Sequence, residues 1–329
     1  MKTISIFNQK GGVGKTTSVV NLAVSLSKLN KKVLVIDFDP QANTTTGLGF
    51  DKNELEKSIY KMFYDEGDNY KDYILKSEEG PYLIASENSL SGLEVELVSL
   101  DEVERLKMLS QIIEEIKKDF DIILIDCPPS LGLLSLNALV ASDSIIIPIQ
   151  TEYYALEGVS ELLKTYQTIK ESIKEDLEIE GVLLCMFDKD TDLSYEVVEE
   201  VKSFFKEKVF STMIPRNIKL AEAPSFGKSV ITYDEKSKGA RAYLYLAKEL
   251  VENIFGKKEK NSKIEEKNDN LNNAEIKNSE KTKEINDEDS KVDKKIDKND
   301  KKENSDEAIV KKNKFSFNQN KLVNNEKRD

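Results

Sequence analysis

The amino-acid sequence predicts an α/β fold with a mostly parallel, twisted sheet that helices flank on both faces. Short runs that are aliphatic throughout, such as Ile-Ile-Leu-Ile at 122–125, alternate with stretches whose apolar residues recur at helical spacing. Strands without a polar face occur in sheets that are covered on both sides, and strand–helix alternation makes such sheets parallel. A glycine-rich segment between the first strand-like run and the first helical stretch adds a third indication, because phosphate-binding folds share this order.

Each element follows from its residue pattern. Strands are expected at 3–8, 33–36, 82–85, 122–125, 144–149, 181–185 and roughly 209–214. Helices are expected at 17–29, about 102–118, 132–140, 157–173, 195–206 and near 239–253. Ligands of such folds bind at the carboxyl ends of the strands, and the motifs described below all lie at such ends.

The composition changes sharply after residue 256. The 329 residues carry a net charge of −12, of which residues 1–256 hold −14 and residues 257–329 hold +2. The second segment consists mainly of Lys, Asn, Glu, Asp and Ser and cannot bury enough apolar surface to offset its ordering entropy. We therefore expect one α/β domain over 1–256 and a charged, low-complexity, disordered tail over 257–329, whose role the sequence leaves open.

The sequence shows no features of a secreted or membrane-spanning protein or of a cysteine-bound metal site. The N-terminus enters the first strand without an apolar signal region, and no apolar run approaches the roughly 20 residues that span a bilayer. Cys127 and Cys185 lack metal-ligand spacing, and the chain has no histidine, which excludes histidine general-base catalysis. We expect a reduced, cytoplasmic protein.

The segment 8–17, Asn-Gln-Lys-Gly-Gly-Val-Gly-Lys-Thr-Thr, is a phosphate-binding loop. Its glycines let the backbone turn its N–H groups toward an anion at the positive end of the following helix. Lys15 is expected to reach the β- and γ-phosphates of ATP, and the Thr16 hydroxyl to bind Mg²⁺. The residues expected to bind the nucleotide here are Gly11, Gly12, Val13, Gly14, Lys15, Thr16 and Thr17.

The loop carries a second lysine, Lys10, in the pattern K-G-G-x-G-K-T. A lysine at this junction points away from its own nucleotide, and one use for it is to neutralise phosphate charge in a facing subunit. The pattern resembles the deviant Walker A class of P-loop ATPases, which includes the ParA/Soj partition proteins, MinD and the nitrogenase iron protein. That resemblance implies a nucleotide-sandwich homodimer in which Lys10 acts in trans.

Two aspartates follow the second strand in the sequence Asp37-Phe-Asp39-Pro. Their spacing predicts that both side chains project to one side, with Asp37 near the metal or the phosphate loop and Asp39 nearer the attacking water. The resemblance to the ParA family implies that Asp39 is needed for hydrolysis.

A third motif, Ile-Ile-Leu-Ile-Asp126-Cys-Pro-Pro, has the Walker B form of an aliphatic strand that ends in an aspartate. Asp126 is expected to hold Mg²⁺ through water. No glutamate follows it, so a strong general base is missing, and we expect slow basal ATP hydrolysis.

The segment from 213 to 228 resembles the C-terminal signature of ParA/Soj proteins, I-P-R-N-x-x-x-x-E-A-P-S-x-G-K. The resemblance covers residues 1 to about 255 and implies that Pro215 and Asn217 lie against the adenine base.

The resemblance also implies DNA binding, because ATP-bound dimers of this family bind double-stranded DNA without sequence preference. Because the domain is acidic, any DNA-binding face must be local. Lys219 matches a position where relatives often carry an arginine that contacts DNA. Asp190 stands at a second such position, where the adjacent Lys189 could substitute. The alternative interpretation of the basic cluster is a solvated surface. The candidate cluster comprises Arg216, Lys219, Lys228, Lys236, Lys238 and Arg241.

The resemblance implies a partition ATPase, associated with the nucleoid, whose slow hydrolysis a ParB-like partner stimulates. A MinD-like membrane-associated positioning ATPase is the alternative, but the end of the tail, residues 315–323, lacks a convincing apolar face for a membrane. A reductase like the nitrogenase iron protein requires cluster cysteines that Cys127 and Cys185 do not match. A small-molecule ligase on the same fold is a further alternative, and the segment from 213 to 228 argues against it.

Overall fold

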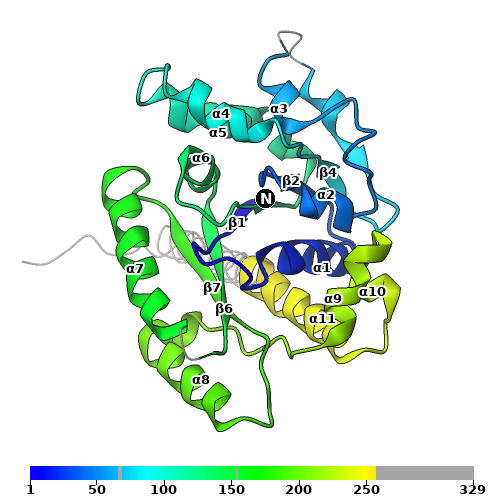
Figure 1. Cartoon of the computed structure of the whole chain (residues 1–329), viewed down its shortest axis with the longest axis vertical. Coiled ribbons are helices and arrows are strands. Elements are labelled where there is room, and N and C mark those ends of the chain that lie inside the picture. Colours follow the sequence, from blue (N-terminus) through cyan, green and yellow to red (C-terminus); the bar gives the residue numbers. More distant parts are fainter. Residues whose placement is uncertain (66–68, 153–154, 257–329) are drawn as a thin grey trace, which may run out of the picture. The chain divides into compact units, whose positions relative to one another are not determined.

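The computed structural model describes residues 1–65, 69–152 and 155–256, apart from the side chains of 155–157 and 161 (Figure 1). The predicted disordered tail, 257–329, lies outside the described residues. None of the described helices has the length and apolar character needed to cross a membrane.

Within the described residues the strands form one seven-stranded sheet in the order β3-β4-β2-β5-β1-β6-β7. Neighbouring strands are parallel except at β3–β4, where the pairing is antiparallel. The mostly parallel twisted sheet expected from the sequence is therefore confirmed. The strands are β1 (Lys2–Ile6), β2 (Val33–Asp37), β3 (Leu75–Lys76), β4 (Tyr82–Ile84), β5 (Ile122–Asp126), β6 (Ser144–Gln150) and β7 (Glu178–Cys185).

Helices cover both faces of this sheet, as Figure 1 shows for α1 and α11 on one side and α4 to α6 on the other. The first half of the chain contributes α1 (Lys15–Lys28), α2 (Asn43–Gly47), α3 (Ile59–Met62), η1 (Tyr70–Tyr73), α4 (Leu90–Leu97), α5 (Glu104–Ile116), η2 (Lys117–Asp119) and α6 (Leu133–Val140). The second half contributes α7 (Ala155–Ser172), α8 (Asp192–Phe205), η3 (Lys206–Lys208), α9 (Ile218–Glu222), η4 (Ala223–Phe226), α10 (Val230–Tyr233), α11 (Lys238–Val251) and η5 (Glu252–Gly256).

The aliphatic strands supply two cores because successive side chains point to opposite faces. On β2, Leu34 and Ile36 belong to the core cluster that includes residues of α3 to α8, whereas Val33 and Val35 belong to the cluster that includes residues of α1, α10 and α11. This division explains why the strands show no polar face in the sequence.

The predicted strand at 209–214 is wrong. The segment makes only isolated bridges to the sheet, at Val182–Val209 and Phe187–Pro215. Its middle is held elsewhere, because the carboxylate of Glu249 accepts hydrogen bonds from the backbone N–H groups of Ser211 (2.6 Å) and Thr212 (3.0 Å). The segment therefore runs beside β7 without joining it as a regular strand.

Strand register brings the motifs to one edge of the sheet. Asp37 at the end of β2 lies opposite Asp126 at the end of β5, and Asp126 lies opposite Ile6 at the end of β1. The glycine-rich loop leaves β1 directly after this position. Three motifs that are far apart in the sequence therefore meet at the carboxyl edge.

Gly181 tests the close packing between β7 and the neighbouring segment. A methyl group added there would lie 2.4 Å from the ring of buried Phe210. We expect Gly181→Ala to lower the free energy of unfolding by about 1–3 kcal/mol, measured by urea denaturation. Gly92→Ala in α4, where the added methyl meets only Glu96 at 3.8 Å, is the control and should be neutral or stabilising. Equal stability of the two variants would contradict this account of the edge.

Candidate nucleotide-binding site

The glycine-rich loop is anchored to the sheet by Asn8. The Asn8 Nδ2 group donates to the carbonyl of Pro148 on β6 (2.7 Å), and its Oδ1 accepts from the backbone of Lys10 (2.9 Å). Gly12 and Gly14 have φ values of 75° and 95°, which only glycine adopts without strain, and Gly14 caps α1. The loop therefore ends at the positive end of a 14-residue helix, where backbone N–H groups attract anions.

The two lysines of the loop have different environments. Lys15 is buried, and its Nζ donates to the carbonyl of Lys10 across the loop (3.1 Å). Burial lowers the pKa of Lys15, although the nearby carboxylate of Asp126 opposes the shift. The side chain of Lys10 is exposed. Lys15 is thus hydrogen-bonded within its own loop, whereas the side chain of Lys10 is accessible to a second molecule.

Asp126 and Asp37 are completely buried side by side. Burial raises the pKa of Asp126 to about 6, opposed by hydrogen bonds to its Oδ2 from the hydroxyls of Thr44 (2.7 Å) and Thr16 (2.9 Å). Burial, followed by repulsion from Asp126, raises the pKa of Asp37 to about 8.

The carboxylate of Asp37 is hydrogen-bonded mainly to α2. Its Oδ2 accepts from both the backbone N–H (2.7 Å) and the hydroxyl (2.6 Å) of Thr45, and its Oδ1 accepts from the backbone of Asp39 (3.3 Å). Both oxygens of Asp37 therefore accept hydrogen bonds from protein donors, whereas only Oδ2 of Asp126 does so among the described residues.

Asp39 lies just beyond this pair. It is 8% exposed, and its Oδ1 accepts from the backbone of Gln41 (2.9 Å). It is near enough to Lys15 and Asp126 to act on the charge of both. The sequence analysis placed Asp39 nearer the attacking water, and that role stays a prediction.

The oxygen ligands at this edge fit Mg²⁺. The Oδ1 atom of Asp126 is buried without a hydrogen-bond partner among the described residues, and the Thr16 hydroxyl is bonded to the other oxygen of the same carboxylate. A hydroxyl and a carboxylate are hard oxygen donors of the kind Mg²⁺ prefers, with phosphates and water completing the shell. The described residues contain no cluster of three or more acidic, cysteine or histidine side chains that could hold a metal by themselves.

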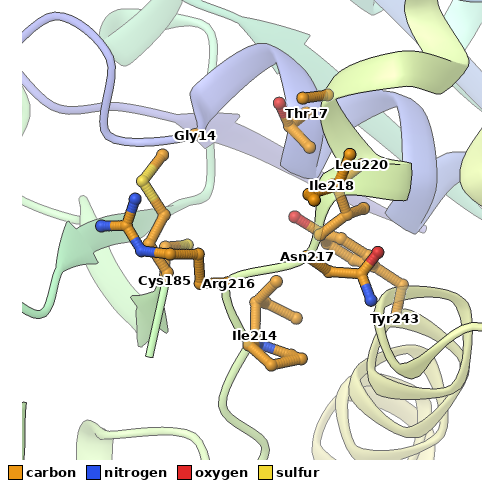
Figure 2. Close-up of a pocket in the computed structure, with 12 residues that line it drawn as sticks. Gly14, Thr17, Cys185, Ile214, Arg216, Asn217, Ile218, Leu220 and Tyr243 are labelled. Carbon is orange, nitrogen blue, oxygen red and sulfur yellow. The ribbon is translucent and has the colours of Figure 1, made fainter. Parts of the chain in front are cut away.

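A pocket of about 390 Å³ opens beside the loop. Figure 2 shows Gly14 and Cys185 on one side of it, and Asn217, Ile218, Leu220 and Tyr243 on the other. Most of the lining is apolar, and the Tyr243 hydroxyl is hydrogen-bonded to Ser18 of α1 (3.1 Å). An aromatic base suits such a pocket, since it is flat and largely apolar.

Pro215 and Asn217 both line this pocket, where the sequence analysis expected the adenine contacts. The Asn217 Oδ1 caps α9 by accepting from the backbone of Lys219 (2.9 Å), which leaves its Nδ2 hydrogens free to face a base.

The predicted DNA-binding residues are not equivalent in the structure. Arg216 forms an ion pair with Glu152 (2.6 Å) and Lys219 with Glu222 (2.8 Å). The Lys219–Glu222 hydrogen bond raises the pKa of Lys219. Lys189, the possible substitute for the Asp190 position, is paired with Asp190 itself (3.5 Å). Lys228, Lys238 and Arg241 are exposed and have no carboxylate partner among the described residues.

Sequence reasoning missed the threonines of α2. Thr44 and Thr45 are completely buried and supply hydroxyls to the two aspartates. The run Asn-Thr-Thr-Thr directly after Asp-Pro-Gln-Ala was a usable signal, because consecutive hydroxyl residues beside an acidic motif are candidate carboxylate donors.

The loop, the carboxyl-edge aspartates and the base-sized pocket together define a P-loop nucleotide-binding protein. The AAA domain family matches residues 1–179, more than half of the chain. The sporulation initiation inhibitor protein Soj of Bacillus subtilis is 49% identical over 252 residues, covering 77% of this chain and 99% of that protein. The chromosome partitioning protein ParA of Myxococcus xanthus is 46% identical, covering 76% and 88%. The chain belongs to the Soj/ParA family of partitioning P-loop ATPases.

Solved structures show the same architecture. The cobyrinic acid a,c-diamide synthase of Mycobacterium smegmatis with bound ATP analogue and magnesium has a TM-score of 0.67 at 31% identity, covering 77% of this chain and 95% of that one. The cell division ATPase MinD of Pyrococcus furiosus has a TM-score of 0.62 at 27% identity, covering 76% and 98%.

Neutralising one buried aspartate should change how stability depends on pH. Because the raised carboxyl pKa values mean that the folded state retains protons the unfolded state has lost, the metal-free protein should lose stability as pH rises from about 4 to about 8. Asp126→Asn should flatten this loss and be more stable than the parent at pH 8, by roughly 1 kcal/mol or more, in thermal or urea unfolding.

The same variant should lose stabilisation by Mg²⁺ added with a non-hydrolysable ATP analogue, because its metal ligand is gone. Asp190→Asn, a change of equal charge at an exposed position, is the control. Parallel pH profiles for Asp126→Asn and the parent would show that the aspartate pair is not the source of the effect.

Proposed function

We propose that this chain is an ATP-dependent partitioning protein that forms a nucleotide-sandwich homodimer and associates with the nucleoid. In this proposal the ATP-bound dimer binds double-stranded DNA without sequence preference. Slow hydrolysis, stimulated by a ParB-like partner, then releases it and drives chromosome or plasmid segregation. The observation that carries the proposal is the exposed Lys10 at the rim of a loop whose own lysine, Lys15, is buried.

An apolar pocket beside a phosphate-binding loop supports ATP as the ligand. The apolar pocket with Pro215 and Asn217 is proposed to hold adenine, and the loop to hold the phosphates. Mg²⁺, held by Thr16 and Asp126 with Asp37 behind them, would neutralise phosphate charge. Lys15 contributes positive charge from within the subunit, and Lys10 contributes it to the facing subunit.

The absence of a strong base among the described residues around Asp126 supports slow turnover. Cys127 follows Asp126 and is buried, and burial raises the pKa of its thiol to about 12, so it supplies no base at neutral pH. Asp39 is proposed to orient the attacking water, since it is the remaining carboxylate beside the loop. In an enzyme of this kind, slow hydrolysis sets how long the ATP-bound dimer persists.

The proposed domain organisation assigns the ATPase to residues 1–256 and leaves 257–329 as a separate charged tail. DNA contact is assigned first to Lys228, Lys238 and Arg241, since Arg216 and Lys219 would have to leave their carboxylate partners. The MinD-like alternative differs in its target, which would be a lipid surface.

Lys10→Ala tests the dimer. The variant should bind ATP with nearly unchanged affinity, because Lys15 and the backbone of the loop remain, but ATP-dependent dimers and turnover should fall at least tenfold. Nucleotide binding, sedimentation velocity and phosphate release measure these three properties. Lys107→Ala, at an exposed position on α5, is the control. A monomeric Lys10→Ala protein that hydrolyses ATP at the parental rate would refute the role in trans.

Asp39→Ala tests whether ATP hydrolysis is needed to release the dimer from DNA. Loss of the water-orienting carboxylate should leave binding and dimerisation intact and trap an ATP-bound dimer, which should co-sediment with DNA and dissociate at high salt. Co-sedimentation with DNA and with anionic vesicles, each with and without ATP, makes the measurement. Binding to vesicles alone would favour the MinD-like function, and normal phosphate release would remove Asp39 from hydrolysis.

A further inference from the structure

A buried serine just after β4, Ser86, lies outside the motifs of the nucleotide site. It is completely buried and follows shortly after Ile84, which pairs with Ile36 of β2. Because β4 and β2 are parallel neighbours, both leave the sheet at its carboxyl edge. Ser86 therefore lies beside the 39–45 segment, which connects the end of β2 to the threonines of α2.

Ser86 makes a hydrogen bond to each end of this segment. Its hydroxyl donates to the backbone carbonyl of Asp39 (2.7 Å), and its backbone N–H donates to the hydroxyl of Thr45 (3.0 Å). The Thr45 hydroxyl in turn donates to the carboxylate of Asp37 (2.6 Å). One buried serine thus connects the proposed hydrolytic aspartate to the threonine that binds the aspartate at the end of β2.

The backbone between these two hydrogen bonds is strained. Ala42 is completely buried and has a φ of 55°, in the left-handed region that favours glycine. A conformation of this kind persists only where surrounding contacts hold it. The Asp39 carbonyl accepts from the N–H of Ala42 (2.9 Å) as well as from the Ser86 hydroxyl, so the serine stabilises the strained turn at the point where it closes.

The residues on either side of Ser86 are bound to the start of α3. The carbonyl of Ala85 accepts from the backbone N–H of Ile59 (2.8 Å). The carboxylate of Glu87 accepts from the hydroxyl of Ser58 (2.5 Å). Ser86 is therefore fixed by the sheet on one side and by α3 on the other, which makes it a rigid support for the strained segment.

We propose that Ser86 is a positioning residue for Asp39, and that its hydroxyl holds the 39–45 segment in the conformation that places the Asp39 carboxylate for hydrolysis. The carboxylate follows the backbone because its Oδ1 accepts from the N–H of Gln41 in the same segment (2.9 Å). Without the serine hydroxyl, the strain at Ala42 is relieved by a change of backbone conformation, and the carboxylate moves with it. The inference rests on the proposed function, since it assumes that Asp39 orients the attacking water.

The test is the full-length variant Ser86→Ala, which removes the hydroxyl and keeps the backbone hydrogen bond to Thr45. Phosphate release at saturating ATP and Mg²⁺ should fall about tenfold or more, because a shift of about 1 Å in a positioned group has an effect of this size or larger. The KM for ATP should change by less than about twofold, since the glycine-rich loop and the base pocket are unaltered.

Ser142→Ala is the matched control. Ser142 is also completely buried, and its hydroxyl donates to the backbone carbonyl of Ala138 (2.8 Å). It precedes β6 and so lies at the edge of the sheet opposite the nucleotide site. Each variant loses one buried hydrogen bond, so both melting temperatures should fall by a similar amount, about 2–4 °C. Only Ser86→Ala should lose turnover.

Hydrogen exchange gives a second readout that does not depend on turnover. Amide exchange is measured by mass spectrometry on peptides that cover the 39–45 segment, in the protein without nucleotide. Exchange in this segment should be faster in Ser86→Ala than in the parent, because its closing hydrogen bond is lost. Ser142→Ala should match the parent in the same peptides.

The outcomes distinguish this inference from the proposed function. Parental turnover in Ser86→Ala, or unchanged exchange in its 39–45 segment, would overturn the inference. An equal loss of turnover in Ser142→Ala would also overturn it, because reduced stability would then be the cause. A parent that hydrolyses no ATP, but whose exchange at 39–45 still depends on the Ser86 hydroxyl, would overturn the proposed function and leave the serine as the support of this segment.

Discussion

Two buried carboxylates that face each other across neighbouring strands constrain the rest of the nucleotide site. Register places Asp37 opposite Asp126, and both side chains are fully removed from water. Such a pair is unfavourable unless hydrogen-bond donors or a cation surround it. Thr16 brings the start of α1 to the pair, and Thr44 and Thr45 bring α2. Hydrogen bonds to the two aspartates thus fix the positions of α1 and α2 at this edge of the sheet.

The second helix transmits this constraint toward the base pocket. The segment after α2 touches the loop after η4 backbone to backbone, since a methyl group at Gly49 would lie 3.2 Å from the carbonyl oxygen of Gly227. Both glycines have positive φ, so larger residues would be strained as well as crowded. The loop at Gly227 therefore lies against the segment that follows α2, and α2 is itself hydrogen-bonded to Asp37 and Asp126.

Local chemistry explains what the sequence could predict. Continuous aliphatic runs predicted the central strands, and the order strand, glycine loop, helix predicted the phosphate site, because both depend on neighbours in the chain. The predicted strand at 209–214 was wrong because Glu249 accepts the backbone N–H groups of Ser211, 38 residues away, and of Thr212. Thr44 was missed because its partner, Asp126, is 82 residues distant. The role of Lys10 stays a prediction, since it depends on a second molecule that no intrachain pattern describes.

The irregular course of 209–214 has a consequence for solubility. β7 is the last strand of the sheet, and an outermost strand with unpaired backbone groups can recruit strands from other molecules. Here Phe210 and Ile214 donate their N–H groups to the carbonyls of Val182 and Leu184, and the Phe210 ring covers Gly181. The border of the sheet is thereby shielded without being extended. Because β7 is covered in this way, its backbone is less able to pair with strands of other molecules.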